Sequence, residues 1–144
     1  MISVPYFNPR DTVDEYGRNK LHYAANNGSV LLIEKLINEG IDINVKDNNG
    51  WTALHFAAKN RHFDAIDLLL ENKADPNITD AQGNSPLWTA TMNTKGNFQG
   101  VLSLLRSGAE PNHSNIHGRS PLQIAKSMQQ GLMECFSPYV TKAS

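Results

Sequence analysis

The sequence has very little cysteine, almost no net charge and no long apolar run. Its single thiol, Cys135, excludes a disulfide within the chain and disfavours a metal site built on cysteine. Thirteen Lys and Arg residues against fourteen Asp and Glu residues leave a formal charge of -1, without the basic stripe that nucleic-acid binders carry. No run reaches the length of about 18 apolar residues that a membrane span needs. We therefore expect neither nucleic acid nor membrane as a partner.

What remains is a chain of 144 residues, of which 40% are hydrophobic and 19% charged. This balance is too apolar for a disordered chain, and the length predicts one domain. Residues 1–6 lack a basic segment followed by an apolar one, so no secretory signal is predicted. We expect a soluble, cytoplasmic protein.

Internal repetition is the strongest feature of the sequence. Four segments, each running from a glycine through a cap residue and a leucine to an alanine, span residues 17–25, 50–58, 83–90 and 118–125. Their glycines lie 33, 33 and 35 residues apart. A second pattern recurs in the same phase at residues 40–44, 73–77 and 108–112. Two patterns in register at this period predict a protein of stacked repeats.

Each unit reads as a turn, a short helix, a longer helix and a loop. An Asp or Asn three residues before the glycine opens the turn, and the glycine permits the positive φ that the turn needs. The short helices have polar N-cap candidates, which are Asn19, Thr52, Ser85 and Ser120. The longer helices show apolar residues at i, i+3, i+6 and i+7, a spacing that places them in one stripe. In the first unit these residues are Val30, Ile33, Leu36 and Ile37.

This pattern resembles the ankyrin repeat, whose motif reads roughly G-x-T-P-L-H-x-A-A. Units one and two match it at the Leu, the His and both Ala, and the resemblance covers about residues 14–137. It implies an all-α fold, a solenoid of stacked helix-turn-helix units with short hairpin-like turns. We divide the chain into a lead-in over residues 1–13, repeats over 14–46, 47–79 and 80–114, and a fourth repeat with a C-terminal cap over 115–144. In the lead-in, Tyr6 and Phe7 are expected to cover the end of the first repeat.

The later units depart from the pattern. Unit three replaces the His by Trp88, which we expect to fill the volume of that His, and carries two extra residues near residues 92–97. Inserted residues fall in loops, where they either modify a binding face or reflect neutral drift. Lys73 stands where Gly40 and Gly108 end the other long helices, so it is predicted to be left-handed at a cost of about 1 kcal/mol.

No pattern in the sequence points to catalysis. The resemblance implies that His22 and His55 tie neighbouring units together by hydrogen bonds, and the other three histidines are spread over different units. There is no phosphate loop or G-x-S-x-G turn. Cys135 lies on an apolar stripe and is interpreted as a core residue. We predict no enzyme activity, no cofactor and no metal site.

The binding candidates lie at the turn tips and on the concave side of the short helices. Trp51 stands out, because Trp, Tyr and Arg dominate interface hot spots; packing over an adjacent turn is its alternative role. The predicted partner-binding residues are Tyr16, Arg18, Tyr23, Asn48, Asn49, Trp51, Phe56, Lys59, Asn60, Gln82, Asn84, Trp88, Met92, Asn93, His117 and Arg119.

These features predict a non-catalytic module that binds another protein. Since the chain is nearly all repeat, it is similar to the small ankyrin proteins that serve as bacterial immunity proteins. That similarity implies a stand-alone inhibitor, monomeric before complex formation, whose concave face occludes a toxin encoded beside it. The alternative is an adaptor or scaffold that bridges partners without inhibition, through a second surface such as the outer side of the longer helices.

Overall fold

The computed structural model describes residues 13–128 and 130–140. Within them the helices are α1 (Lys20–Asn27), α2 (Val30–Asn38), α3 (Ala53–Lys59), α4 (Phe63–Glu71), α5 (Pro86–Met92), α6 (Gln99–Arg106), α7 (Pro121–Ser127) and α8 (Gln130–Phe136), followed by a 3-10 turn at Ser137–Tyr139. No helix in this part of the chain is long and apolar enough to cross a membrane. Of the predicted lead-in only Val13 is described, so the expected cover by Tyr6 and Phe7 lies outside the described residues.

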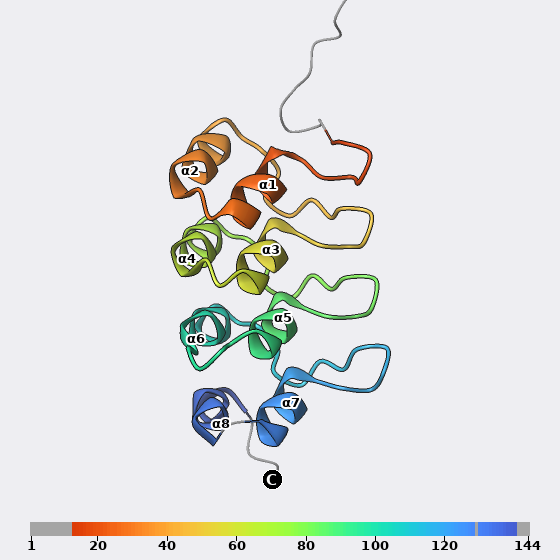
Figure 1. The fold of residues 1–144 in the computed structure, drawn as a ribbon, viewed down its shortest axis with the longest axis vertical. Helices are drawn as coiled ribbons and strands as arrows, with labels where there is room; N and C mark the ends of the chain where they lie inside the picture. Colours follow the sequence, from red (N-terminus) through yellow and green to blue (C-terminus); the bar gives the residue numbers. More distant parts are fainter. Residues whose placement is uncertain (1–12, 129, 141–144) are drawn as a thin grey trace, which may run out of the picture.

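The helices form pairs that stack along the long axis of the molecule (Figure 1). The first helices of the pairs, α1, α3, α5 and α7, lie between the second helices, α2, α4, α6 and α8, and a column of loops. We call these loops the fingers; they carry Gly17, Gly50, Gly83 and Gly118. First helices pack on first helices and second helices on second helices. This is the all-α solenoid that the sequence predicts.

Each first helix begins at a polar side chain that caps it. The side-chain oxygen of Asn19, for example, accepts the backbone N–H of His22 at 3.0 Å. The N-caps that make this bond are Asn19, Thr52, Ser85 and Ser120. Pro86 and Pro121 occupy the first positions of α5 and α7, where a missing N–H breaks no helical hydrogen bond. The predicted starts of the first helices are confirmed.

The first residue of each finger accepts hydrogen bonds from backbone N–H groups of the same finger. One oxygen of Asp47 accepts the backbone N–H of Asn49 at 2.9 Å and that of Trp51 at 2.8 Å. The equivalent bonds are made by Asp14, Asp80 and Asn115. Neighbouring fingers are also joined through their backbones, since the N–H of Asn48 donates to the oxygen of Tyr16 at 2.8 Å. The fingers therefore form one continuous column.

The core runs between the two layers of helices for the length of the stack. Ala25 and Ala58 are buried, and their small size lets neighbouring first helices approach. In unit three Thr91 takes this position, and its hydroxyl donates to the backbone oxygen of Leu87 at 2.7 Å, which satisfies the buried group. In unit four the position of Ala25 and Ala58 is occupied by Lys126. Lys126 is exposed, because no helix pair packs beyond α7 in the described residues.

Left-handed residues follow the second helices. The φ angle is 85° at Gly40, 72° at Lys73 and 93° at Gly108, which confirms the prediction for Lys73. A non-glycine residue pays about 1–2 kcal/mol for this conformation. The extra residues of unit three lie in the loop between α5 and α6.

Candidate functional site

Three hollows adjoin one another where the first helices meet the bases of the fingers. The central hollow has a volume of about 340 Å³, and the other two have volumes of about 320 and 220 Å³. Lys59 lines all three, while Arg18, Trp51 and Phe56 each line two. The hollows are therefore one surface, which we call the central groove.

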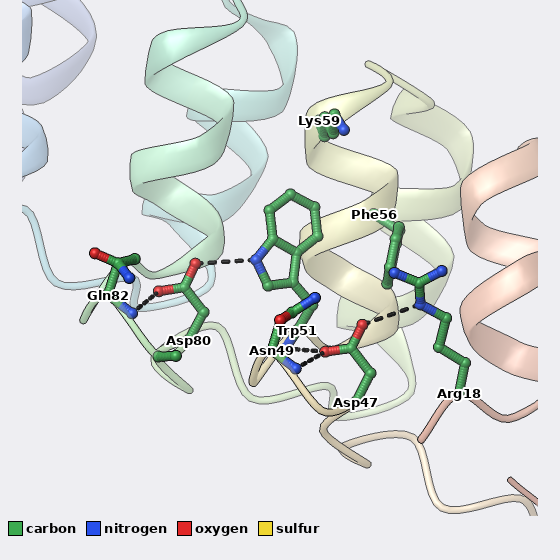
Figure 2. A pocket seen from close by; sticks show the side chains of 9 residues that line it. Arg18, Asp47, Asn49, Trp51, Phe56, Lys59, Asp80 and Gln82 are labelled. Carbon is green, nitrogen blue, oxygen red and sulfur yellow. Dashed lines mark hydrogen bonds and ion pairs between the residues drawn. The ribbon is translucent and has the colours of Figure 1, made fainter. Parts of the chain in front are cut away.

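Trp51 is held from several sides (Figure 2). Its indole Nε1 donates to Oδ2 of Asp80, in the next finger, at 3.0 Å. The ring stacks on His55 with centroids 5.5 Å apart and meets the ring of Phe56 edge-on at 5.1 Å. Trp51 is half-buried as a result. It therefore packs against the next finger, the alternative role considered from the sequence, and its exposed part lines the groove.

Arg18 is anchored by a buried carboxylate. Its Nε donates to Oδ2 of Asp47 at 3.1 Å, and the two side chains are 26% and 1% exposed. The hydrogen bond to Asp47 raises the pKa of Arg18, so the guanidinium stays charged. The guanidinium carbon lies 5.1 Å from the ring centroid of Phe56. Arg18 thus holds a cation over an apolar ring at a fixed place in the groove.

Asp80 and Lys59 also lie close to Trp51 (Figure 2). Oδ1 of Asp80 accepts the backbone N–H groups of Gln82 and Asn84, both at 2.9 Å. Lys59 is exposed, and its Nζ lies 5.6 Å from the Trp51 ring centroid. The groove thus combines two cations, an aromatic floor and carboxylates that are tied into the fingers.

Two buried histidines join the first three units. Nδ1 of His22 accepts the N–H of Asn19 at 3.0 Å, and its Nε2 bonds to the backbone oxygen of Trp51 at 2.9 Å. His55 makes the same two bonds, to its N-cap N–H at 3.1 Å and to the oxygen of Asn84 at 2.9 Å. Because Nδ1 accepts, the ring proton is on Nε2 and each ring is neutral. Burial lowers the pKa of both histidines. The structural role implied by the resemblance is confirmed.

The structure gathers most of the predicted binding residues along the groove. The central hollow is lined by Arg18, Asn49, Trp51, Phe56, Lys59 and Gln82 among the predicted residues. The adjoining hollows add Tyr23, Asn84, Trp88, Met92 and Asn93. Phe56 is only 9% exposed, so it forms the floor and does not protrude. Trp88 is half-buried and lines a hollow, and it does not take the fully buried place of His22 and His55.

Five predicted residues lie outside the three hollows. Four are exposed on the fingers, namely Tyr16, Asn48, His117 and Arg119. Asn60 follows α3, and its side-chain amide donates to the side-chain oxygen of Asn26 in the preceding unit at 2.7 Å. Asn60 therefore joins two repeats.

Asp47 and Asp80 line the central hollow, although the sequence analysis treated them only as the openers of turns. A constant sequence separation could have identified these two aspartates. Asp47 lies 29 residues after its partner Arg18, and Asp80 lies 29 residues after Trp51. Because neighbouring fingers stack, the last residue of one finger (Arg18 or Trp51) contacts the first residue of the next (Asp47 or Asp80) at this constant separation.

Other reactive side chains lie apart from the groove. Within the described residues, no three His, Cys, Asp or Glu side chains gather where they could hold a metal ion. Cys135 is half-buried, and its Sγ lies 3.6 Å from the backbone oxygen of Gly131. Burial raises the pKa of this thiol, which reduces the thiolate fraction. Cys135 is thus a partly buried residue packed against the core.

A protein-family model described as ankyrin repeats in three copies matches residues 21–115. The chain belongs to the ankyrin repeat family. No curated protein matches it. The matched region of this ankyrin repeat protein runs from α1 to α6, and α7 and α8 add a further helix pair in the same order. Ankyrin repeats are protein–protein interaction modules and generally bind other proteins.

Proposed function

We propose that this ankyrin repeat protein is a non-catalytic module that binds another protein through the central groove. The observation that carries the proposal is Trp51, a large aromatic side chain that is fixed by Asp80 and His55 yet half-open to the groove. A side chain that is ordered before binding loses little conformational entropy when a partner covers it. Trp and Arg, which both line the groove, are also the residue types most enriched in hot spots.

The finer proposal is that binding inhibits the partner. A protein seated on the groove and the neighbouring fingers would have one face covered, and an active site on that face would be closed to substrate. We extend the proposal to a toxin encoded beside this chain as the inhibited partner, as the sequence analysis predicts. In this proposal the chain acts as a monomer in the cytoplasm until the complex forms.

Removal of the Trp51 side chain tests the groove. Trp51→Ala is expected to weaken binding of the partner by about 2 kcal/mol, roughly 30-fold in Kd, or more, because a hot-spot ring is lost. Calorimetric titration with the product of the adjacent gene measures the change. Trp51→Phe is the matched control, since it keeps an aromatic ring of smaller area and loses the hydrogen bond to Asp80. Melting curves of both variants show whether the fold persists, and an unchanged Kd for folded Trp51→Ala removes Trp51 from the interface.

Inhibition is tested by co-expression. Cells that make the adjacent gene product should grow when this chain is present and stop growing when it carries Trp51→Ala. A stable complex in which the partner keeps its full activity would refute inhibition and favour an adaptor.

One observation favours the adaptor as the second candidate function. Leu31 and Leu32 of α2 are 83% and 40% exposed. The helix α2 belongs to the layer of second helices, which lies away from the fingers (Figure 1). An adaptor needs a second surface of this kind. Leu31→Glu should then abolish binding of a second partner and leave groove binding intact, which pull-downs with both partners would measure.

A further inference from the structure

We propose that the central groove is selective for an acidic side chain of the partner, whose carboxylate lies between Arg18 and Lys59 above the rings of Phe56 and Trp51. This inference rests on the proposed function and adds the chemistry that the partner must present. The occupant is an aspartate or glutamate on the surface of a protein.

Two cations flank two aromatic rings in the central hollow (Figure 2). The guanidinium carbon of Arg18 lies 5.1 Å from the Phe56 centroid, and Nζ of Lys59 lies 5.6 Å from the Trp51 centroid. The two rings are themselves 5.1 Å apart. The methylene groups of an acidic side chain can rest on these rings while its oxygens meet the cations. A hollow of about 340 Å³ has room for such a side chain.

The two carboxylates of the hollow already accept most of the hydrogen bonds that they can. Asp47 accepts from Nε of Arg18 and from the backbone N–H groups of Asn49 and Trp51. Asp80 likewise accepts from the indole of Trp51 and from two backbone N–H groups. Each carboxylate therefore receives three of the roughly four hydrogen bonds that it can accept. An incoming cation would find little acceptor capacity and would be repelled by Lys59.

The donors, in contrast, remain in excess. Neither of the two ion pairs among the described residues involves Lys59. Asp47 uses only Nε of Arg18, and the Tyr23 hydroxyl is a further partner of the guanidinium, whose remaining N–H groups are left for other acceptors. Donors without matching acceptors favour an anionic ligand.

The charge balance disfavours a ligand with two negative charges. Arg18 and Lys59 contribute two positive charges to the hollow, and Asp47 and Asp80 contribute two negative ones. A phosphate dianion would be repelled by both carboxylates, and the lining offers it side-chain donors in place of the helix N-terminus or backbone N–H nest typical of phosphate sites. A carboxylate carries half that charge and pairs well with guanidinium and ammonium groups. The geometry therefore points to Asp or Glu.

A random peptide library displayed on phage tests this preference. The folded full chain, Lys59→Glu and Lys126→Glu are each used for selection. Lys126 is an exposed lysine on α7 and lines none of the three hollows, so it controls for the change in net charge. The native chain and Lys126→Glu should enrich Asp or Glu at one position, and Lys59→Glu should lose that enrichment and favour Lys or Arg. The proposal is overturned by a native selection without binders, by binders without an acidic position, or by the same acidic preference in Lys59→Glu.

A titration gives a second measurement. A selected peptide should bind the ¹⁵N-labelled chain at least tenfold more tightly than its Glu→Gln or Asp→Asn counterpart, and should shift the indole N–H signal of Trp51. Equal affinity of the two peptides would contradict the carboxylate contact. The same shift with inorganic phosphate at equal concentration would contradict the choice of carboxylate over phosphate.

Failure of this inference and failure of the proposed function give different results. Peptides that lose binding in Trp51→Ala but show no acidic preference overturn the inference alone. A complete partner protein that binds Trp51→Ala and Lys59→Glu as tightly as the native chain overturns the groove as the interface, and the inference with it.

Discussion

At the scale of single residues, several side chains occupy backbone conformations that suit glycine. Lys73 has a φ of 72° where Gly40 and Gly108 stand in other units, and Arg61 has a φ of 55° at the place of Gly28 in the first unit. These residues carry strain that glycine would not. The fold tolerates it because each such strain is small beside the stability of a domain.

Lys73→Gly should release this strain. The free energy of unfolding is expected to rise by about 1 kcal/mol, and Tm by about 2–4 °C. Lys46→Gly is the control, because Lys46 is an exposed loop residue without a positive φ and glycine there only loosens the unfolded chain further. Thermal melts followed by circular dichroism measure both. A lower or unchanged Tm for Lys73→Gly would show that the left-handed strain is absent.

The buried histidines should make stability depend on pH. Burial holds the pKa of His22 and His55 below the ordinary value of 6.5 in the folded chain. Their contribution to stability is therefore complete above pH 6.5 and is lost as the pH falls below it. The reason is that the histidines of the unfolded chain have the higher pKa and bind protons first, which favours unfolding. The double variant His22→Gln, His55→Gln copies Gln123, which closes the same cap in unit four at 3.0 Å.

The double variant is expected to lose less Tm than the native chain between about pH 7.5 and pH 5, the interval around the histidine pKa. Melts at several pH values measure the slope. An equally steep fall in both proteins would assign the pH dependence to other groups.

At the scale of the element, the finger is the unit that carries contacts from one repeat to the next. Its first residue, such as Asp47, accepts hydrogen bonds from two backbone N–H groups of the same finger. Its last residue, such as Trp51, bonds to the first residue of the next finger, 29 positions later. A backbone hydrogen bond also joins Ala81 to the oxygen of Asn49 at 2.9 Å. Each finger is thus positioned by its neighbour, and Trp51 is positioned by both.

Substitutions at two glycines can distinguish the cost of backbone strain within a finger from the cost of a clash between neighbouring fingers. Gly50 and Gly118 have similar φ angles of 81° and 73°. A Cβ on Gly50 would lie 2.8 Å from Cα of Asp80, whereas one on Gly118 would meet nothing within 4 Å. Gly118→Ala should cost about 1–2 kcal/mol of conformational strain alone. Gly50→Ala should cost clearly more, because the next finger must move. Urea unfolding measures both, and equal losses would argue against close packing of the fingers.

At the scale of the whole molecule, the chain is a linear stack in which each helix pair packs on its neighbours. Stability in such a stack is approximately a sum of unit and interface contributions. A change in the last pair should therefore be felt mainly near α7 and α8. The groove lies over α1, α3 and α5, so it should be insulated from damage at that end.

Phe136→Ala tests this insulation. Phe136 is fully buried in α8, and its loss should cost about 3–5 kcal/mol. Hydrogen exchange is expected to speed up most in α7 and α8 and least in α1 and α2. Leu21→Ala, at a buried site in α1, is the mirror control and should have its largest effect at the opposite end. Uniform acceleration along the whole chain would show that the stack unfolds as one cooperative unit.

The features that the sequence predicted correctly depend on neighbours within a few residues. N-caps such as Asn19 bond to an N–H three positions away, and the acids that open the fingers bond two and four positions away. Left-handed helix ends such as Lys73 follow from the position in the repeat. Even the stacking of units followed from the period, since one unit cannot bury its apolar face alone.

Tertiary structure alone decided that the predicted binding residues share one groove and what each side chain does there. Trp51 bonds to an acid in the next finger, and Phe56 lies beneath Arg18. The carboxylates of Asp47 and Asp80 each accept hydrogen bonds from donors in two repeats. These relations depend on how far one repeat is displaced and rotated relative to the next. That geometry comes from the packing of whole helices, so no local pattern encodes it.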